Sequence, residues 1–103
     1  MDNDRVLGFL GLAAKAGKLV SGEEMCLRMI HKGKVRCIIM AEDASSNARQ
    51  RLSKACSAAG IRCLTYGNKA SLGRHIGKEI RAVVGVMDGN FSKRLMELVT
   101  GVE

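Results

Sequence analysis

The chain has 103 residues, which is enough for one compact domain and too few for two, so residues 1–103 are predicted to form a single domain. Hydrophobic residues make up 47% of the sequence, which is ample for a single core and argues against a disordered chain. Seventeen lysines and arginines outnumber ten aspartates and glutamates, giving a formal charge of +7. Nucleic acid is the commonest partner of so positive a domain, although a soluble domain that is merely basic remains an alternative.

Membrane and secretory functions find no support in the sequence. Acidic Asp2 and Asp4 stand near the start of the sequence, where a signal peptide would have basic residues and then a long apolar stretch, so no signal peptide is expected. No apolar run approaches the roughly 20 residues that span a bilayer, and no predicted helix combines a basic face with bulky apolar residues. Four cysteines lie inside apolar segments without a C-x-x-C spacing: Cys26, Cys37, Cys56 and Cys63. They are predicted to be reduced core residues of a cytoplasmic protein rather than metal ligands.

The first predicted elements are a helix and a short strand. Asp2–Asp4 can cap the helix, and Gly17 can end it. Its apolar face runs through Val6 and Leu10. A strand at Leu19–Val20 follows, bringing the chain to the stretch with the strongest local signals.

A second helix is predicted to begin at Ser21. Ser21 and Glu24 have the S-x-x-E spacing of a capping box, in which each side chain bonds the other residue's backbone N–H. The residues predicted to face inward are spaced along one side of the helix: Met25, Cys26, Met29 and Ile30. Gly33 stands where a residue with positive φ would end the helix.

The rest of the chain continues the alternation of helices and strands. The nearly unbroken apolar run Val35–Ala41 predicts a central strand covered on both faces. The later predicted elements are a helix from Ser45 or Ser46 to Gly60, a strand over 62–66, a short helix capped by Asn68, a strand over 82–87 and a last helix capped by Asp88 or Asn90. This order predicts an α/β domain with helices on both faces of a mostly parallel, mixed sheet.

Catalytic motifs are weak in this sequence. The segment Gly11–Lys18 has the wrong glycine spacing for a phosphate-binding loop, and no Ser or Thr follows its lysine. His31 and His75 have no carboxylate at helical spacing to orient them. The pair Glu42–Asp43 follows a strand, where a capping role is more typical than catalysis. We therefore expect no enzymatic activity, no cofactor, no metal site and no small-molecule substrate.

Three features favour RNA as the partner. The first is the junction 18–24, where helix N–H groups follow Lys18 and could receive a phosphate. The second is the row formed by Arg28 and Lys32, and the third is the turn Tyr66–Lys69. Ligands usually meet loops at one end of such a sheet, so 18–24 and 66–70 are expected to share a surface. Taken singly, each feature is also explained by a capping box, an Arg28–Glu24 ion pair or a simple turn.

The order and spacing of these segments resemble a known family. The segments are Ser21-Gly22-Glu23-Glu24, Arg28, Lys32-Gly33, Ala41–Ala44, Asn68–Gly73 and Gly77. They are similar to those of the ribosomal proteins that bind kink-turn RNA, of the archaeal large-subunit type. The opening Leu10–Ala13 and the ending Val86–Phe91 resemble the small bacterial YlxQ-like members. The resemblance covers roughly residues 5 to 98.

This resemblance implies a three-layer α/β/α sandwich that binds RNA at the start of the second helix and the loop before the fourth. Gly22 and Arg28 match the family's Gly and Lys, whereas Glu24 and Met25 replace an Asn and a Glu that serve the sheared G·A bases. Glu24 could accept from a guanine amino group, but Met25 cannot hydrogen-bond a base. The predicted RNA-binding residues are Lys18, Ser21, Gly22, Glu23, Glu24, Arg28, Lys32, Gly67, Asn68 and Lys69.

The sequence therefore predicts a monomeric, non-enzymatic protein that binds a kink-turn-like or ribosomal RNA. The alternative is a protein-interaction adaptor that uses the same fold without RNA specificity.

Overall fold

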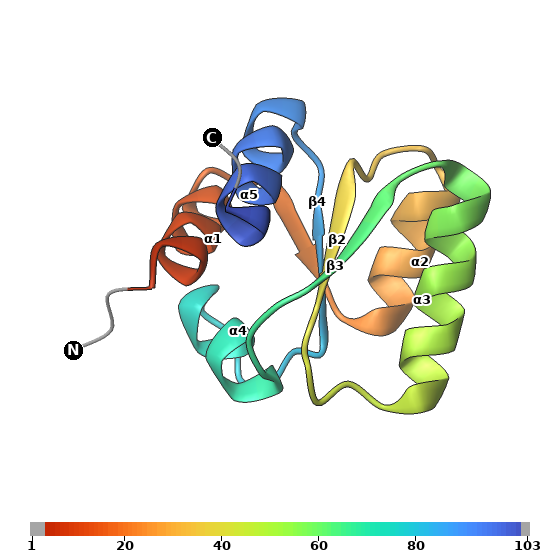
Figure 1. Cartoon of the computed structure of the whole chain (residues 1–103), viewed down its shortest axis with the longest axis horizontal. Helices are drawn as coiled ribbons and strands as arrows, with labels where there is room; N and C mark the ends of the chain where they lie inside the picture. The colour runs from red at the N-terminus through yellow and green to blue at the C-terminus, as the bar shows by residue number, and fades with distance from the viewer. Residues whose placement is uncertain (1–3, 102–103) are drawn as a thin grey trace.

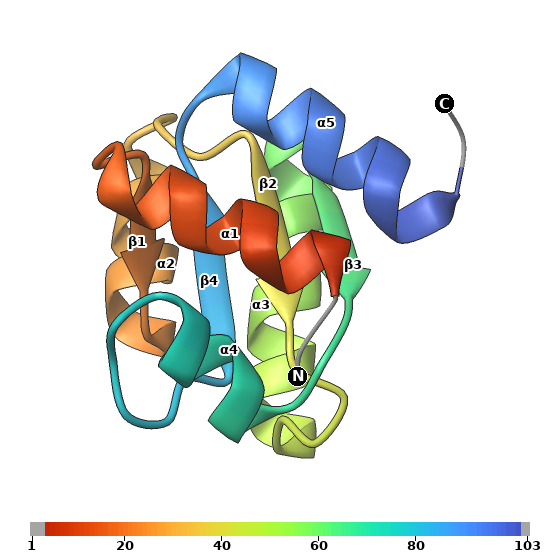
Figure 2. The same cartoon turned by 90° about the vertical axis from the view of Figure 1, so that its left-hand side faces the viewer.

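A computed structural model describes residues 4–101 as five helices around a four-stranded sheet (Figure 1). The elements are α1 (Arg5–Lys15), β1 (Leu19–Ser21), α2 (Glu23–His31), β2 (Cys37–Met40), α3 (Ser46–Ala59), β3 (Arg62–Thr65), α4 (Lys69–His75), β4 (Val83–Val86) and α5 (Gly89–Thr100). Helices α2 and α3 cover one face of the sheet, and α1, α4 and α5 cover the other (Figures 1 and 2). The predicted α/β/α sandwich is confirmed. No helix in residues 4–101 is long and apolar enough to cross a bilayer.

The strands lie in the order β1-β4-β2-β3, and β4 runs against its two neighbours. Only β2 and β3 form a parallel pair. The prediction of a mixed sheet is confirmed, but the prediction that it is mostly parallel is wrong because β4 inserts between two strands of the opposite direction. As a result, the carboxyl ends of β1, β2 and β3 meet the amino end of β4 at one edge of the sheet.

The apolar run that predicted a central strand forms β2, and this strand is covered on both faces. Cys37 and Ile39 pack in the core cluster beneath α1 and α5, whereas Ile38 and Met40 pack in the cluster beneath α2 and α3. All four side chains are fully buried, as expected for alternating faces of a central strand.

Most helix starts follow the predicted capping chemistry. The Asp4 carboxylate accepts from the Leu7 N–H at 3.0 Å and caps α1. The other predicted caps of that helix, Asp2 and Asn3, lie outside the described residues. Three further helices, α3, α4 and α5, are capped in the same way. Their first N–H groups donate to the capping side chains, from Ala48 to Ser45, from Ser71 to Asn68 and from Phe91 to Asp88.

Candidate nucleic-acid interface

The start of α2 lacks the predicted capping box. Ser21 belongs to β1, and Gly22 takes the capping position with φ 92° and no side-chain hydrogen bond. The Gly22 N–H donates to the Val83 carbonyl at 2.9 Å, so pairing between strands decides where the helix begins. Gly22 therefore offers the N–H groups of the first turn no side-chain acceptor. Met25, predicted to face inward, is 39% exposed beside them.

The two glutamates of this first turn bind one arginine of α3. Arg51 donates to both Glu23 and Glu24, the latter at 3.1 Å. The hydrogen bond from Arg51 to Glu24 raises the pKa of Arg51 above its already high ordinary value. The alternative explanation of Arg28 as an ion-pair partner of Glu24 does not apply, since Glu24 pairs with Arg51. Arg28 is exposed and forms no ion pair within residues 4–101.

The loop before α4 is held by the residues that follow β2. The Glu42 N–H donates to the Gly67 carbonyl at 2.7 Å, and the Asp43 carboxylate accepts from the Lys69 N–H at 2.9 Å. Gly67 has φ 68°, a conformation that favours glycine. Asp43 therefore orients the loop before α4, whereas the helix that follows the acidic pair, α3, is capped by Ser45.

Arg81 brings the two candidate segments together. Its Nε donates to Ser21 Oγ at 3.1 Å, and its backbone N–H donates to the Lys69 carbonyl, also at 3.1 Å. The part of the predicted surface formed by 21–24 and 66–70 is thus assembled around one arginine. Sequence reasoning missed Arg81 because it lies 60 residues from Ser21 and no local pattern marks it.

Lys18 and Lys32 lie away from this assembly. Lys18 precedes β1, and its carbonyl accepts from the Met87 N–H at the opposite edge of the sheet. Lys32 follows the nine-residue α2, about 14 Å along the helix from its start. The ten predicted residues therefore divide between two ends of the molecule, with Arg28 between them.

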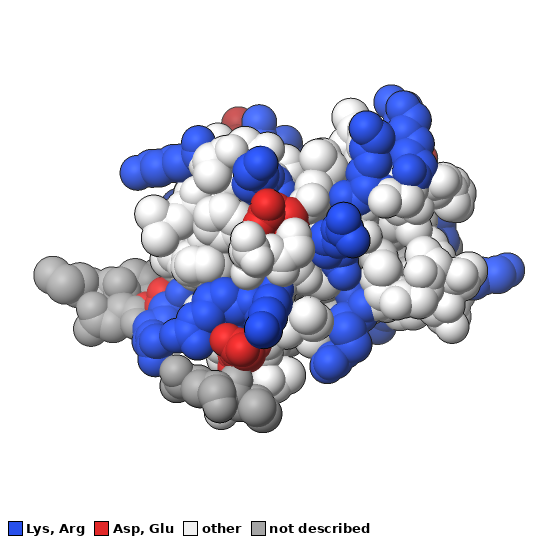
Figure 3. All heavy atoms as spheres, turned by 90° about the horizontal axis from the view of Figure 1, so that it is seen from above, with Lys and Arg blue, Asp and Glu red and all other residues white. Residues whose placement is uncertain are grey.

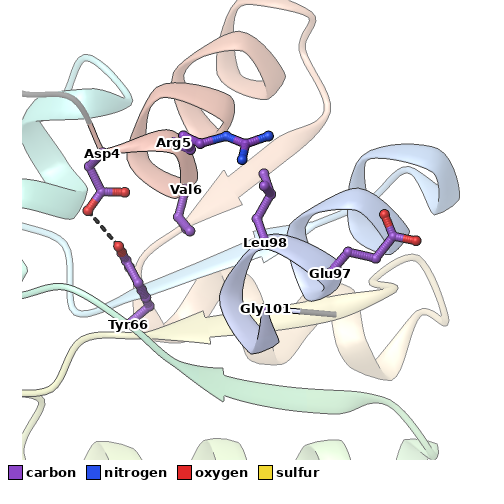
Figure 4. Close-up of a pocket in the computed structure, with 7 residues that line it drawn as sticks. All are labelled: Asp4, Arg5, Val6, Tyr66, Glu97, Leu98 and Gly101. Carbon is purple, nitrogen blue, oxygen red and sulfur yellow. Dashed lines mark hydrogen bonds between the residues drawn. The ribbon is translucent and has the colours of Figure 1, made fainter. Parts of the chain in front are cut away.

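Tyr66 ties the end of β3 to α1 (Figure 4). Its hydroxyl donates to Asp4 Oδ2 at 2.5 Å, at the edge of a pocket also lined by Val6 and Leu98. Burial alone would raise the pKa of Asp4, but hydrogen bonds from Tyr66 and from backbone N–H groups bring it below its ordinary value. The one tyrosine of the chain thus has a structural role beside the candidate site.

The described part of the chain does not assemble a metal site at this edge. No group of three or more His, Cys, Asp or Glu side chains in residues 4–101 is placed to hold a metal ion. What the edge does offer is an uncapped helix start, an ordered turn and the adjoining cations Lys69 and Arg81.

Comparisons with known proteins relate almost the whole chain to one family. The ribosomal protein L7Ae/L30e/S12e/Gadd45 family matches residues 4–96. The RNA-binding protein YlxQ of Bacillus subtilis (strain 168) is 38% identical over 90 residues, which is 87% of this chain and 90% of that protein. The RNA-binding protein YlxQ of Enterococcus faecium is 32% identical over 100 residues, covering 97% and 96%.

Solved structures are similar in fold. A protein with unknown function from Bacillus halodurans C superposes with a TM-score of 0.92 at 37% identity, covering 95% of this chain and 99% of that one. The 15.5kD RNA binding protein of Giardia lamblia superposes with a TM-score of 0.80, covering 99% and 91%. At 22% identity, this second likeness shows the fold alone.

Proposed function

Because the chain belongs to the ribosomal protein L7Ae/L30e/S12e/Gadd45 family, we propose that it binds structured RNA through the start of α2 and the loop before α4. The predicted kinship with YlxQ-like members is confirmed by two relatives of nearly equal length. Both relatives are named RNA-binding proteins. The similarity of this chain to them over nearly its full length is the observation that carries the proposal. The family also accords with the expectation that the chain is not an enzyme.

The start of α2 is suited to a phosphate group. Its first-turn N–H groups point out of the N-terminal end of the helix, where the helix dipole is positive. Gly22 has no neighbouring atom within 4 Å of the position a Cβ would take, so an RNA backbone can approach closely. Arg28 continues this surface along the exposed side of α2, and Lys69 adjoins it through Arg81.

Base recognition at this surface would fall to Glu24 and Asn68. The side chain of Glu24 is 76% exposed, and its ion pair with Arg51 lies in solvent, where such pairs contribute little. Glu24 can therefore exchange Arg51 for a guanine amino group at small cost. Asn68 uses Oδ1 to accept from the Ser71 N–H, which leaves its amide nitrogen to donate. Met25 can offer a base only an apolar contact.

The test is to titrate two RNAs of equal length and composition, one containing a kink-turn and one a plain duplex, at low and moderate salt. A preference for the kink that persists at moderate salt would support recognition of bent RNA at this site. Equal, salt-sensitive binding would support RNA binding but contradict kink-turn specificity. Binding to neither RNA would contradict the proposal and favour a protein-interaction adaptor.

A charge-reversal variant tests where on the molecule RNA binds. Arg28→Glu is expected to weaken binding to every RNA and to lower the slope of log affinity against log salt by about 1. Lys93→Glu is the matched control, because Lys93 is an exposed cation of α5, which covers the face of the sheet opposite α2 (Figure 1). Equal affinities of the two variants would contradict a site at α2.

A further inference from the structure

The end of the sheet opposite the proposed site carries a row of cations from three strands. Lys18 precedes β1, Arg36 precedes β2, and Arg62 opens β3. The Arg36 N–H donates to the Val86 carbonyl at 2.7 Å, and Arg62 lies opposite Cys37, so the strand register brings these residues to one edge. All three residues are exposed. Figure 3 views this end, where lysine and arginine side chains stand at several places on a mostly uncharged surface and occupy more of it than acidic side chains do.

Carboxylates are distributed differently between the two ends. The end that holds the proposed site carries five acidic residues on or beside its loops: Glu23, Glu24, Glu42, Asp43 and Glu79. At the opposite end, the Asp88 carboxylate caps α5 by accepting from the Phe91 N–H at 2.9 Å. The side chains of Lys18, Arg36 and Arg62 form no ion pair within residues 4–101. Much of the +7 charge therefore acts at the end away from the proposed site.

Helix ends explain only part of this basic surface. Lys15 lies in the last turn of α1 and Lys32 follows the last turn of α2, where cations stabilise the negative end of a helix. Lys18 is close to a helix end as well, since its N–H donates to the Ala13 carbonyl of α1, whereas strand pairing places Arg36 and Arg62 at the starts of β2 and β3. From β1 to β3 they span three strand spacings, or about 14 Å. That length is suited to several successive phosphates of one nucleic-acid strand.

We propose that this basic end, defined by Lys18, Arg36 and Arg62, binds the phosphate backbone of a second RNA segment. The proposal rests on the proposed function, which makes RNA the partner of the first site. The two arginines can each form paired hydrogen bonds with a phosphate. Because the strands separate the two ends, one protein would bridge two segments of a folded RNA.

The experiment measures capture of a second RNA by a complex already formed. Kink-turn RNA is immobilised, saturated with the full-length protein and washed, and a fluorescent plain RNA duplex is then added at increasing salt. The wild-type complex is expected to capture the duplex. The variant Arg36→Glu/Arg62→Glu is expected to load onto the immobilised RNA normally but to bind the duplex about tenfold or more weakly, with a smaller salt slope.

The control variant Arg5→Glu/Lys54→Glu makes the same change in net charge at exposed positions of α1 and α3. It is expected to capture the duplex more tightly than the basic-end variant does. Equal losses in the two variants would overturn the proposal in favour of a general charge effect, and undiminished capture by the basic-end variant would also overturn it. Melting curves of both variants are the check that each retains the fold.

Failure of the first site can be told apart from failure of the second. If wild-type protein does not load onto kink-turn RNA, the proposed function fails, and titration of the duplex in solution still tests the basic end through the same two variants. Binding to vesicles containing phosphatidylserine that is lost in the basic-end variant, without any duplex binding, would overturn the RNA proposal in favour of a membrane surface.

Discussion

Gly73 determines where the loop carrying Arg81 can lie. A Cβ atom at this buried position of α4 would stand 1.8 Å from the Glu79 carbonyl oxygen. Gly73→Ala must therefore displace the segment 76–82, and overpacking of this kind costs about 1–3 kcal/mol in the free energy of unfolding. Because Arg81 joins Ser21 to the loop before α4, RNA affinity should fall as well. Urea denaturation and RNA titration measure the two effects.

Gly8→Ala is the matched control for that substitution. Gly8 is exposed within α1, and nothing lies within 4 Å of the position its Cβ would take. Alanine should stabilise the protein there by about 0.5–1 kcal/mol, because it favours the helix more than glycine does. A Gly73→Ala protein as stable as the Gly8→Ala protein would contradict the close approach at Glu79.

The cysteines also differ from one another at the residue scale. A hydrogen bond from Cys56 in α3, aided by Ser53 and by the charge of Arg49, outweighs burial and lowers the pKa of Cys63 to about 7. The same contact raises the pKa of Cys56, and burial raises those of Cys26 and Cys37. All four are free thiols, as predicted, but Cys63 is only half-buried.

We expect Cys63 to be alkylated first in the folded protein. A lowered pKa means that the reactive thiolate forms at lower pH, so the rate with iodoacetamide should level off above about pH 7, not near pH 9. Peptide mapping after brief labelling identifies the residue, and Cys63→Ser should remove the fast reaction. A rate that continues to rise through pH 9 would contradict the effect of Cys56.

At the scale of elements, local patterns predicted the helix starts that depend on neighbouring residues. Ser45, Asn68 and Asp88 cap their helices because each side chain reaches an N–H three residues away. The same spacing failed at Ser21 and Glu24, since pairing of Ser21 with Val84 places it in β1. A residue more than 60 positions away decided that boundary, and no local spacing carries such information.

This correction predicts different costs for two substitutions. Glu24→Ala should change the free energy of unfolding by less than about 0.5 kcal/mol, because it removes an exposed ion pair and Glu23 still binds Arg51. Ser45→Ala should cost about 1 kcal/mol, because it removes the hydrogen bond that caps α3. Urea denaturation compares them directly, and equal losses would reinstate a capping role for Glu24.

At the scale of the whole molecule, the sequence predicted the layers better than the directions of the strands. Hydrophobic runs revealed four strands, but their order depends on pairings between distant segments, which placed β4 between β1 and β2. The candidate site was affected in the same way. Lys18 and Ser21 are only three positions apart in sequence, yet the strand residues between them carry them to opposite ends of the sheet.

The uneven charge of the molecule predicts how salt affects its stability. Repulsion among the cations of the basic end is screened as salt shortens the Debye length from about 30 Å at 0.01 M to about 8 Å at 0.15 M, so the melting temperature should rise over that range. Arg36→Glu/Arg62→Glu removes this repulsion and should melt higher at low salt, with a smaller rise. Arg5→Glu/Lys54→Glu lowers the net charge equally but leaves the cluster, so it should keep most of the rise. Calorimetry at several salt concentrations measures the melting temperature of each variant. An identical dependence of melting temperature on salt in the two variants would mean that only the total charge matters.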